Sequence, residues 1–474
     1  MTAGTFHDVA EIACDPARTL VYEHGWQSWS PAGVHRADRT SPRPARDRWQ
    51  VMAYRPETPA PPTGVQSEGL LAVQADGVGP TTLVATPDPH RAVPSIRTTA
   101  LADRVVVSAD GPVDVRTVDE PIPAALAAWA DEIAARLGIS TAPQPPGWCS
   151  WYCHGPRVTA ADVAAAVDTA VAADLPIEVV QVDDGYQAEI GDWLDRRTPA
   201  FDEPLHTLTA RIAAAGMQSG IWTAPLCVGT GSALARAHPD GLVGGARASD
   251  PPWGQPIRGR DVTHPAAAAH LVEVFATLRR WGFSYHKIDF IYAGALPGRR
   301  HADCTPLDAY AEALRLIRHG LEEGGGAATL LGCGAPLLPS IGAVDAMRVS
   351  PDVDPRWDPP DGDVSQPSMH GALLAGRARA WQHGRLWVND PDCILVRPEV
   401  AHREAWAGYL DALDGLAVSS DALDALDDRG LALTRRLLRP SGPGPAPTWR
   451  PDPDDAAGGR LDGEPAAPAG SGTP

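Results

Sequence analysis

Long hydrophobic runs and basic clusters are both missing from this sequence of 474 residues. It has no uncharged apolar stretch of about 18 residues, the length that a membrane-spanning helix requires. Residues 1–16 contain no basic segment followed by an apolar one, so we do not expect a secretory signal peptide. The 40 Lys and Arg residues are outnumbered by 59 Asp and Glu residues, giving a formal charge of −19, and they form no cluster. Because nucleic acids and anionic membranes bind basic faces, we expect neither as a partner.

The sequence also has few cysteines and no metal-binding pattern. Its seven cysteines are scattered, odd in number and without a C-x-x-C pair, which is typical of a reducing cytoplasm rather than of a disulfide-bonded secreted domain. The 15 histidines form no H-x-x-x-H or H-x-H pattern at a predicted strand end. We therefore expect a cytoplasmic protein without a bound metal.

Composition divides the chain into three parts. Residues 1–140 contain short β-rich runs separated by Asp-Gly and Pro, which predict a β-domain, followed by a linker helix over 123–137 that ends at Gly138. Residues 141–440 alternate short apolar runs with helix-length segments. Residues 441–474 are rich in Pro, Gly, Ala and Asp and cannot bury enough apolar area to offset their ordering entropy, so we expect a disordered tail.

The alternating part predicts a barrel. Eight strands with helical crossovers indicate a closed parallel (β/α)8 barrel more than an open sheet. In such a barrel, the side chains at the carboxyl ends of the strands converge on the active site. The strand candidates are Gly147–Cys153, Ile177–Asp183, Gln218–Thr223, Tyr285–Asp289, Ala328–Cys333, Ala346–Ser350, Leu386–Asn389 and Leu416–Ser419.

Carboxylates and aromatic residues gather at these predicted strand ends, a composition that suits a neutral polyhydroxylated ligand. Lys287 and Asp289 lie two residues apart on one strand, so both side chains face the barrel interior. An ammonium group beside a carboxylate keeps it ionised, as a nucleophile requires. The adjacent acids Asp183 and Asp184 end another strand and suit sugar hydroxyls or a metal.

Glycoside hydrolysis needs two carboxyl groups, one that attacks the anomeric carbon and one that protonates the leaving oxygen. The loop that follows Arg348 offers a second carboxyl group to face Asp289. Asp352 and Asp354 both qualify by their chemistry, and the spacing alone does not choose between them.

Nine short motifs, taken together and in order, resemble those of the α-galactosidases of glycoside hydrolase family 36, of the short prokaryotic type. The resemblance runs through the whole predicted barrel and includes one motif of the N-terminal β-sandwich. The motifs are HGWQSWS (24–30), GWCSWY (147–152), QVDDGY (181–186), IGDWL (190–194), GIWTAP (220–225), KIDF (287–290), LGCG (331–334), MRVSPD (347–352) and NDPDC (389–393).

The resemblance implies a (β/α)8 barrel preceded by a β-sandwich, with the C-terminal β-domain reduced or absent. It implies a retaining double displacement with Asp289 as nucleophile and Asp352, rather than Asp354, as general acid/base. Asp183 and Asp184 would hold the O4 and O6 hydroxyls of galactose. The family uses no metal or organic cofactor. The other residues expected to bind the sugar are Lys287, Arg348, Trp222 and Cys333 in the pocket, Trp193 at its rim, Trp151 in the first predicted strand and His154 at its end.

The expected activity is hydrolysis of terminal α-linked galactose from small α-galactosides by a monomer or small homo-oligomer. Two related enzymes share the same residues: a raffinose-synthase-like enzyme that transfers galactose to another sugar, and an α-N-acetylgalactosaminidase. A catalytically dead carbohydrate-binding barrel is the alternative outside the enzymes. It is disfavoured because both Asp289 and Asp352 are present.

Overall fold

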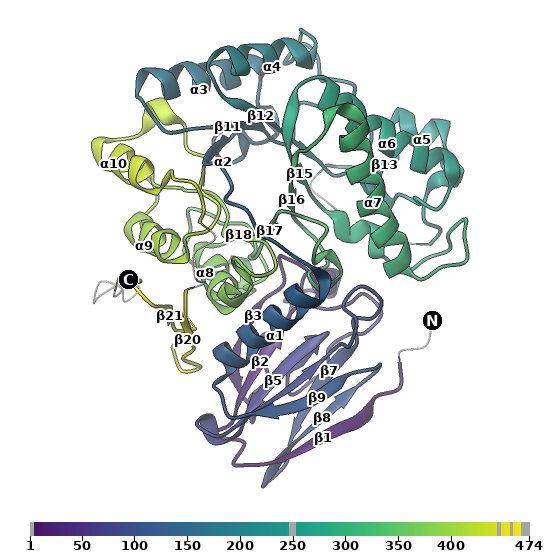
Figure 1. Ribbon diagram of the computed structural model, residues 1–474, viewed down its shortest axis with the longest axis vertical. Coiled ribbons are helices and arrows are strands. Elements are labelled where there is room, and N and C mark those ends of the chain that lie inside the picture. Colours follow the sequence, from purple (N-terminus) through teal and green to yellow (C-terminus); the bar gives the residue numbers. More distant parts are fainter. Residues whose placement is uncertain (1–3, 246–252, 443–446, 456–457, 466–474) are drawn as a thin grey trace.

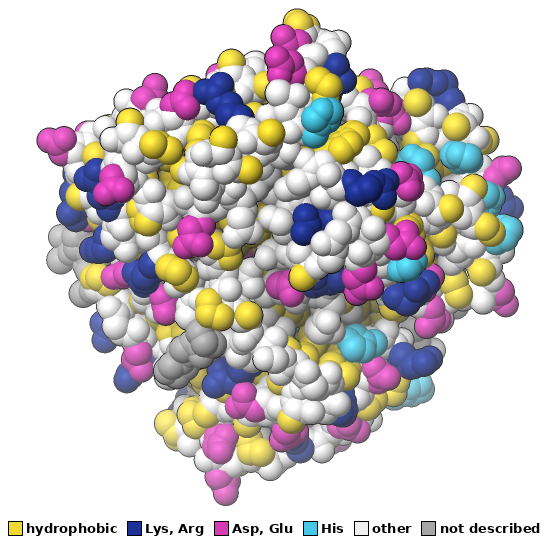
Figure 2. Space-filling view, turned by 45° about the horizontal axis from the view of Figure 1, so that its top comes forward, with side chains coloured by type: hydrophobic (Ala, Val, Ile, Leu, Met, Phe, Trp, Pro, Cys, Tyr) yellow, Lys and Arg dark blue, Asp and Glu magenta, His cyan; other side chains and the backbone are white. Residues whose placement is uncertain are grey.

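The computed structural model describes residues 4–245, 253–442, 447–455 and 458–465 (Figure 1). An N-terminal β-sandwich packs beneath a larger barrel of parallel strands surrounded by helices, as the sequence predicted. Within the described residues, no helix is long and apolar enough to cross a membrane. Acidic and basic side chains are interspersed over the face shown in Figure 2.

Two antiparallel sheets form the sandwich. Their inner faces enclose a core that includes Val21, Val73 and Ile96, because alternate residues of each strand point inward. One sheet has the order β1 (His7–Ala13), β8 (Arg104–Ala109), β7 (Ser95–Ala100) and β4 (Gln66–Glu68). The other has the order β3 (Ala32–Arg36), β2 (Leu20–His24), β5 (Leu70–Gln74), β6 (Thr81–Ala85) and β9 (Asp114–Val118).

The linker helix α1 (Ile122–Leu137) lies between the sandwich and the barrel (Figure 1). It ends at Gly138, whose φ of 66° is a left-handed C-cap, as predicted. Tyr22 and Leu70 alternate with the inward residues of their strands and pack in one apolar cluster with α1 and the barrel helices. The second sheet is therefore covered on both faces.

The barrel contains eight parallel strands. They follow the order β18 (Val388–Asp390), β17 (Ala346–Arg348), β16 (Thr329–Gly332), β15 (Phe283–Ile288), β12 (Gln218–Thr223), β11 (Val179–Val182), β10 (Gly147–Cys149) and β19 (Val418–Ser419). Backbone hydrogen bonds from Leu416 to Asn389 (2.8 Å) and from Ile394 to Val418 (2.7 Å) close the ring. The inward side chains include Cys149, Val179 and Tyr285, which form a separate apolar cluster in the barrel interior.

Helices cover the outside of the barrel (Figure 1). They are α3 (Ala160–Ala172), α4 (Leu205–Ala214), α6 (Pro265–Arg280), α7 (Pro306–Gly325), α8 (Met369–Ala378), α9 (Arg403–Leu413) and α10 (Asp428–Leu437). Shorter elements lie in the loops: α2 (Trp151–His154), α5 (Ala233–Ala237), β13 (Cys227–Gly229) and β14 (Ile257–Gly259). The 3-10 turns are η1 (Asp47–Met52), η2 (Ala75–Gly77), η3 (Gly155–Arg157), η4 (Pro239–Gly241), η5 (Ile291–Ala295), η6 (Leu338–Ser340), η7 (Pro360–Gly362), η8 (Ala380–Gln382) and η9 (Leu423–Ala425).

The first barrel strand is shorter than predicted. It ends at Cys149, and residues 151–154 form the helix α2 instead of continuing the strand. The amide of His154 donates to the carbonyl of Ser150 at 3.1 Å, which closes a helical turn at once after the strand. Apolar composition did not reveal this helix, because a short buried helix and a buried strand have the same apolar composition.

The expectation of a disordered tail is wrong for the described residues after 440. They include the two-stranded sheet of β20 (Trp449–Arg450) and β21 (Arg460–Leu461). Trp449 is 3 % exposed and packs edge-on against Tyr22, with ring centroids 6.1 Å apart. Glu464 accepts a hydrogen bond from Nε of Arg377 at 3.1 Å. A few buried residues thus anchor a segment whose average composition is that of a disordered chain.

Candidate active site

Strand β15 delivers Lys287 and Asp289 to the carboxyl end of the barrel, in line with the inward-facing Tyr285. The carboxylate of Asp289 is 6 % exposed and both of its oxygens accept hydrogen bonds. Nε1 of Trp222, from β12, donates to one oxygen at 2.9 Å, and the amide of Phe290 donates to the other at 2.7 Å. These two donors fix the orientation of the carboxylate.

The backbone immediately after Asp289 is strained. Phe290 has a φ of 50°, a left-handed conformation that a bulky side chain rarely adopts and that costs about 1–3 kcal/mol. Gly334 lies so close that a Cβ there would be 2.9 Å from the Phe290 nitrogen. This turn aims the Phe290 amide back at the Asp289 carboxylate, so the strain accompanies the contact that holds the candidate nucleophile.

Asp183 pairs with Lys287. Its Oδ2 accepts hydrogen bonds from Nζ of Lys287 at 3.0 Å and from Nε2 of Gln181 at 2.6 Å. Burial lowers the pKa of Lys287, but the negative charges of Asp183 and Asp289 outweigh it and hold that pKa well above its usual value. The lysine therefore stays charged between the two acids.

Asp184, the next residue, accepts hydrogen bonds from a different set of donors. It accepts from Nε2 of Gln187 at 2.6 Å and from Nε1 of Trp253 at 2.7 Å. Burial raises the pKa of Asp184, and these two hydrogen bonds offset the increase only in part.

Arg348, at the end of β17, contacts three carboxylates. Its nitrogens lie 2.9 Å from Asp352, 3.1 Å from Asp390 and 2.7 Å from Asp392. Burial opposes the charge of the guanidinium, but Asp390 and Asp392 outweigh it and keep the pKa of Arg348 well above its usual value. This arginine ties the end of β18 to the loop that carries Asp352.

Asp352 and Asp354 lie in contrasting environments. The Asp352 side chain is 33 % exposed, and its surroundings raise its pKa to about 7. Loss of solvation among the surrounding protein atoms is the largest cause, the charges of Asp392 and Asp289 add to it, and Arg348 opposes it. Asp354 instead forms a bidentate pair with Arg356 at 2.8 and 3.1 Å, which lowers its pKa although burial acts the other way.

Asp392 and Tyr152 support the Asp352 loop, and sequence analysis missed both roles. Asp392 accepts hydrogen bonds from the amide of Val353 at 2.7 Å and from the hydroxyl of Tyr152 at 2.5 Å. Its own φ is 84°, an unusual left-handed value for a residue other than glycine. The NDPDC motif (389–393) was the available signal, but it served only as one of the motifs that carry the family resemblance.

A group of aromatic rings surrounds Asp289. Trp222 contacts Trp193 edge-on with centroids 5.7 Å apart, and Trp253 packs on Phe290 at 4.8 Å. Trp29, from the N-terminal sandwich, lies edge-on to Phe290 at 4.7 Å. The sequence did not predict that Trp29 and Trp253 belong to this group, because both arrive from segments distant in the chain.

Two of the predicted sugar-binding residues lie elsewhere than expected. Trp193 is 1 % exposed and packs edge-on against Trp222, so its ring is buried rather than open at a rim. His154 approaches Asp162 of α3 at 4.0 Å and lies edge-on to Trp148, whose indole donates outward to the carbonyl of Asp421. These contacts turn His154 toward the helix layer.

Two further residues predicted to bind the sugar, Trp151 and Cys333, lie on the interior side of the barrel. Trp151 packs against the apolar cluster inside the barrel. Cys333 is buried, and burial together with the charge of Asp289 raises the pKa of its thiol well above the usual value, so that it stays neutral. In the part of the chain that the structure describes, no group of three or more His, Cys, Asp or Glu residues is arranged to hold a metal ion.

Comparisons with known proteins agree with this geometry. Residues 157–302 match the family model described as melibiase. The structure is similar to TtGalA, an α-galactosidase from Thermus thermophilus solved with p-nitrophenyl α-D-galactopyranoside, with a TM-score of 0.74 and 26 % identity over 92 % of this chain and 89 % of that one. The structure is equally similar to the same enzyme solved with stachyose, with a TM-score of 0.74 and a match over 94 % of that enzyme's chain. AgaA, a family 36 α-galactosidase from Geobacillus stearothermophilus, shares the fold at a TM-score of 0.62 and 12 % identity, over 90 % of this chain and 61 % of AgaA.

The barrel, the paired carboxyl groups and these matches define a glycoside hydrolase. More narrowly, residues 157–302 match the melibiase family, and the predicted resemblance to the short family 36 α-galactosidases is confirmed.

Proposed function

We propose that the protein is a retaining exo-α-galactosidase with Asp289 as nucleophile and Asp352 as general acid/base. The observation that carries this proposal is the different tuning of the two carboxyl groups. Asp289 is held by two hydrogen-bond donors near the charged Lys287, whereas the pKa of Asp352 is raised to about 7. A carboxyl group that holds its proton near neutral pH, facing a carboxylate that is held in place by donors, is what acid catalysis and nucleophilic attack require in one site.

In the first step, an Asp289 oxygen attacks the anomeric carbon while Asp352 gives its proton to the departing glycosidic oxygen. The alcohol leaves, and galactose remains as an ester on Asp289. In the second step, Asp352, now a carboxylate, takes a proton from water as the water attacks the anomeric carbon. Asp289 departs as a carboxylate, and the galactose is released with its original α configuration.

The same geometry supports Asp352 over Asp354 as the acid/base. Arg356 binds both oxygens of Asp354 and lowers the pKa of that carboxyl group, so Asp354 is ionised and unable to donate a proton. Asp352 is protonated over a wider pH range and interacts electrostatically with Asp289.

The sugar would be held by the carboxylates and aromatic rings around Asp289. Asp183 and Asp184 would bind the O4 and O6 hydroxyls, since they are adjacent, buried and fixed by several donors. The complexes of TtGalA with an aryl α-galactoside and with stachyose support galactosides of both kinds as substrates. The other residues proposed for the pocket are Lys287, Arg348, Trp222, Cys333 and Trp151.

The proposal is tested with 4-nitrophenyl α-D-galactoside beside its α-gluco, β-galacto and α-N-acetylgalactosaminyl counterparts, with and without chelator. We expect selective, chelator-resistant cleavage of the α-galactoside. Preference for the N-acetylgalactosaminide, or turnover only when an acceptor sugar is added, would replace the proposal with one of the two related enzymes. Silence on all four from folded protein would indicate a barrel that only binds.

We also propose that the protein acts in the cytoplasm and is organised as a sandwich over 1–140 and a catalytic barrel over 141–440. All seven cysteines are free thiols in the structure, which supports a reducing compartment.

A further inference from the structure

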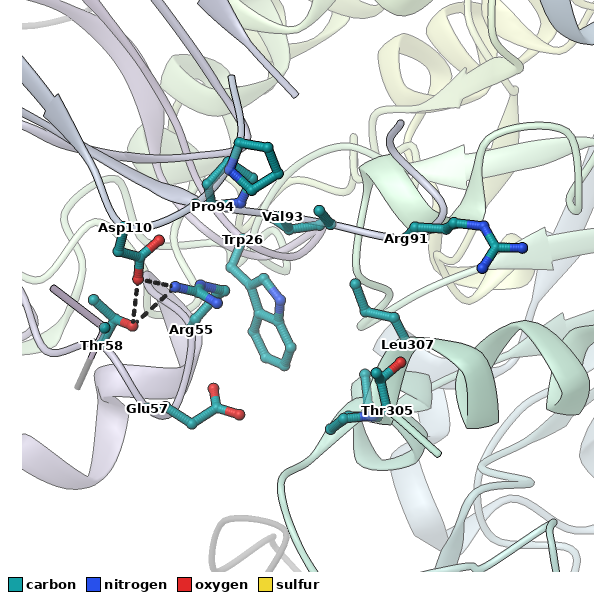
Figure 3. A pocket seen from close by; sticks show the side chains of 16 residues that line it. Trp26, Arg55, Glu57, Thr58, Arg91, Val93, Pro94, Asp110, Thr305 and Leu307 are labelled. Atoms are coloured by element: carbon teal, nitrogen blue, oxygen red, sulfur yellow. Dashed lines mark hydrogen bonds and ion pairs between the residues drawn. The ribbon is translucent and has the colours of Figure 1, made fainter. Parts of the chain in front are cut away.

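A cavity of about 380 Å³ lies between the N-terminal sandwich and the barrel (Figure 3). Residues of the sandwich form most of its wall, and Ala295, Thr305 and Leu307 of the barrel close the other side. None of the residues assigned to the candidate active site lines it. Its volume is within the range of about 300–1,000 Å³ that is typical of small-ligand sites.

One side of the cavity is a preformed polar cluster. Nη2 of Arg55 donates to Asp110 at 2.5 Å and to Thr58 at 3.0 Å, and the amide of Ser95 donates to the other Asp110 oxygen at 2.8 Å. Nε of Arg55 lies 3.3 Å from Glu68. Figure 3 shows the Arg55–Thr58–Asp110 group on one side of Trp26, with Leu307 and Thr305 across from it. The cluster needs no ligand to hold its shape.

Several polar groups at the cavity are open to hydrogen bonding, although Glu57 also interacts electrostatically with Arg300. The Glu57 carboxylate, Nη1 of Arg55 and the indole N–H of Trp26 make no hydrogen bond among the described residues. The Arg91 guanidinium is largely exposed and lies 3.9 Å from Asp88. The site thus offers donors and an acceptor beside an aromatic ring and the apolar Leu307.

The charges around the cavity cancel. The charged side chains that line it are two bases and two acids, Arg55, Arg91, Glu57 and Asp110. A site without net charge, with an aromatic wall and both donors and acceptors, suits a neutral molecule with many hydroxyl groups. We propose that this cavity is a second saccharide-binding site, separate from the site that contains Asp289.

The cavity is also connected to the candidate active site. The turn η5 begins two residues after Asp289 and ends at Ala295, which lines the cavity. Trp26 packs edge-on against Tyr292 of this turn at 6.1 Å, and Trp29 of the same N-terminal motif packs on Phe290. A bound saccharide therefore contacts the far end of the element that follows the candidate nucleophile.

Sucrose, maltose and trehalose are suitable probes because none contains galactose. Their binding to the full-length protein is measured by saturation-transfer NMR and located by crystal soaking. We expect at least one of them to bind saturably beside Trp26, with equal affinity in the wild type and in the active-site variant Asp183→Ala. Glu57→Ala should weaken binding by about tenfold, because it removes a carboxylate that is open to hydrogen bonding.

Leu307→Trp should abolish binding by filling the cavity, and Asp103→Ala, an exposed acid elsewhere in the sandwich, should change nothing. Circular dichroism confirms that each variant is folded. Binding that is lost in Asp183→Ala but kept in Glu57→Ala belongs to the active site and overturns the proposal. It is also overturned if none of the three disaccharides binds, or if glycine or phenylalanine binds in their place.

Discussion

At the scale of single residues, the contrast between Asp352 and Asp354 shows how two identical side chains acquire different chemistry. They lie two positions apart on one loop, yet one has a pKa raised to about 7 and the other is held ionised by Arg356. The sequence could name both carboxyl groups as candidates. Local spacing and chemistry could not choose between them, and only the family resemblance favoured Asp352. The physical difference depends on Arg348, Asp392 and Asp289, which reach the loop through space.

The raised pKa of Asp352 predicts the basic side of the pH profile. Asp352 must be protonated for the first step, so kcat/KM should fall as the pH rises through about 7. In Asp352→Asn this fall should disappear with aryl galactosides, whose good leaving groups need no proton, and hydrolysis of raffinose should be nearly abolished. Steady-state profiles with both substrates check this, and Asp354→Asn is the matched control. If Asp354→Asn loses the fall instead, the assignment is reversed.

The role of Asp289 predicts chemical rescue. Asp289→Ala should lose nearly all turnover, because no ester can form on the missing carboxylate. Added azide should enter the vacated space, restore cleavage of aryl galactosides and yield β-galactosyl azide, identified by NMR. Azide-independent residual activity, or a product of α configuration, would show that Asp289 is not the nucleophile.

Replacing Asp392 should change the pH dependence of catalysis without unfolding the protein. Its charge is one of the causes that raise the pKa of Asp352. In Asp392→Asn the basic limb of the kcat/KM profile should therefore move to lower pH, while the thermal midpoint changes little. If the basic limb of the kcat/KM profile stays at the wild-type pH, Asp392 has only a structural role.

At the scale of elements, the sequence predicted what depends on local pattern. Period-two alternation placed Lys287 and Asp289 on one face of β15, and the apolar runs marked all eight barrel strands. The helix α2 and the contacts of Trp29 and Trp253 escaped prediction. The contacts of Trp29 and Trp253 depend on where distant segments pack. The helix α2 has the same apolar composition as a short strand, so local composition could reveal neither feature.

The sheet of β20 and β21 predicts a stability effect far from the active site. Trp449→Ala should lower the free energy of unfolding by about 3–5 kcal/mol, because it empties a buried site beside Tyr22. Urea unfolding measures this loss, and activity of the folded protein should persist. Arg450→Ala is the control, since Arg450 is exposed and adjacent. Equal stability of both variants would contradict the packing of this sheet.

At the scale of the whole molecule, buried histidines link stability to pH. Burial lowers the pKa of His24 and His286 to about 3, and that of His270 and His383 to about 4. These residues are neutral in the folded protein but take up protons near pH 6.5 when the chain unfolds. Their contribution to stability is therefore complete above that pH and is lost as the pH falls toward 4.

The raised pKa values of Glu68 and Asp352, both about 7, act in the opposite direction over the same range. Burial also raises the pKa values of Asp184 and Asp421, but not by a large shift. Because the four large histidine shifts outnumber the two large acid shifts, the free energy of unfolding should be lower at pH 5 than at pH 7. Urea unfolding at the two pH values checks the sign. Greater stability at pH 5 would mean that the acids dominate.

In the proposed mechanism, galactose is released with the α configuration of the substrate, because the reaction passes through an ester on Asp289. Proton NMR of an aryl α-galactoside during the first minutes of hydrolysis tests it most directly, because the first anomer released is visible before mutarotation. We predict that α-galactose appears first and that the β-anomer accumulates only afterward. If β-galactose appears first, the enzyme inverts configuration, and the double displacement proposed here is contradicted.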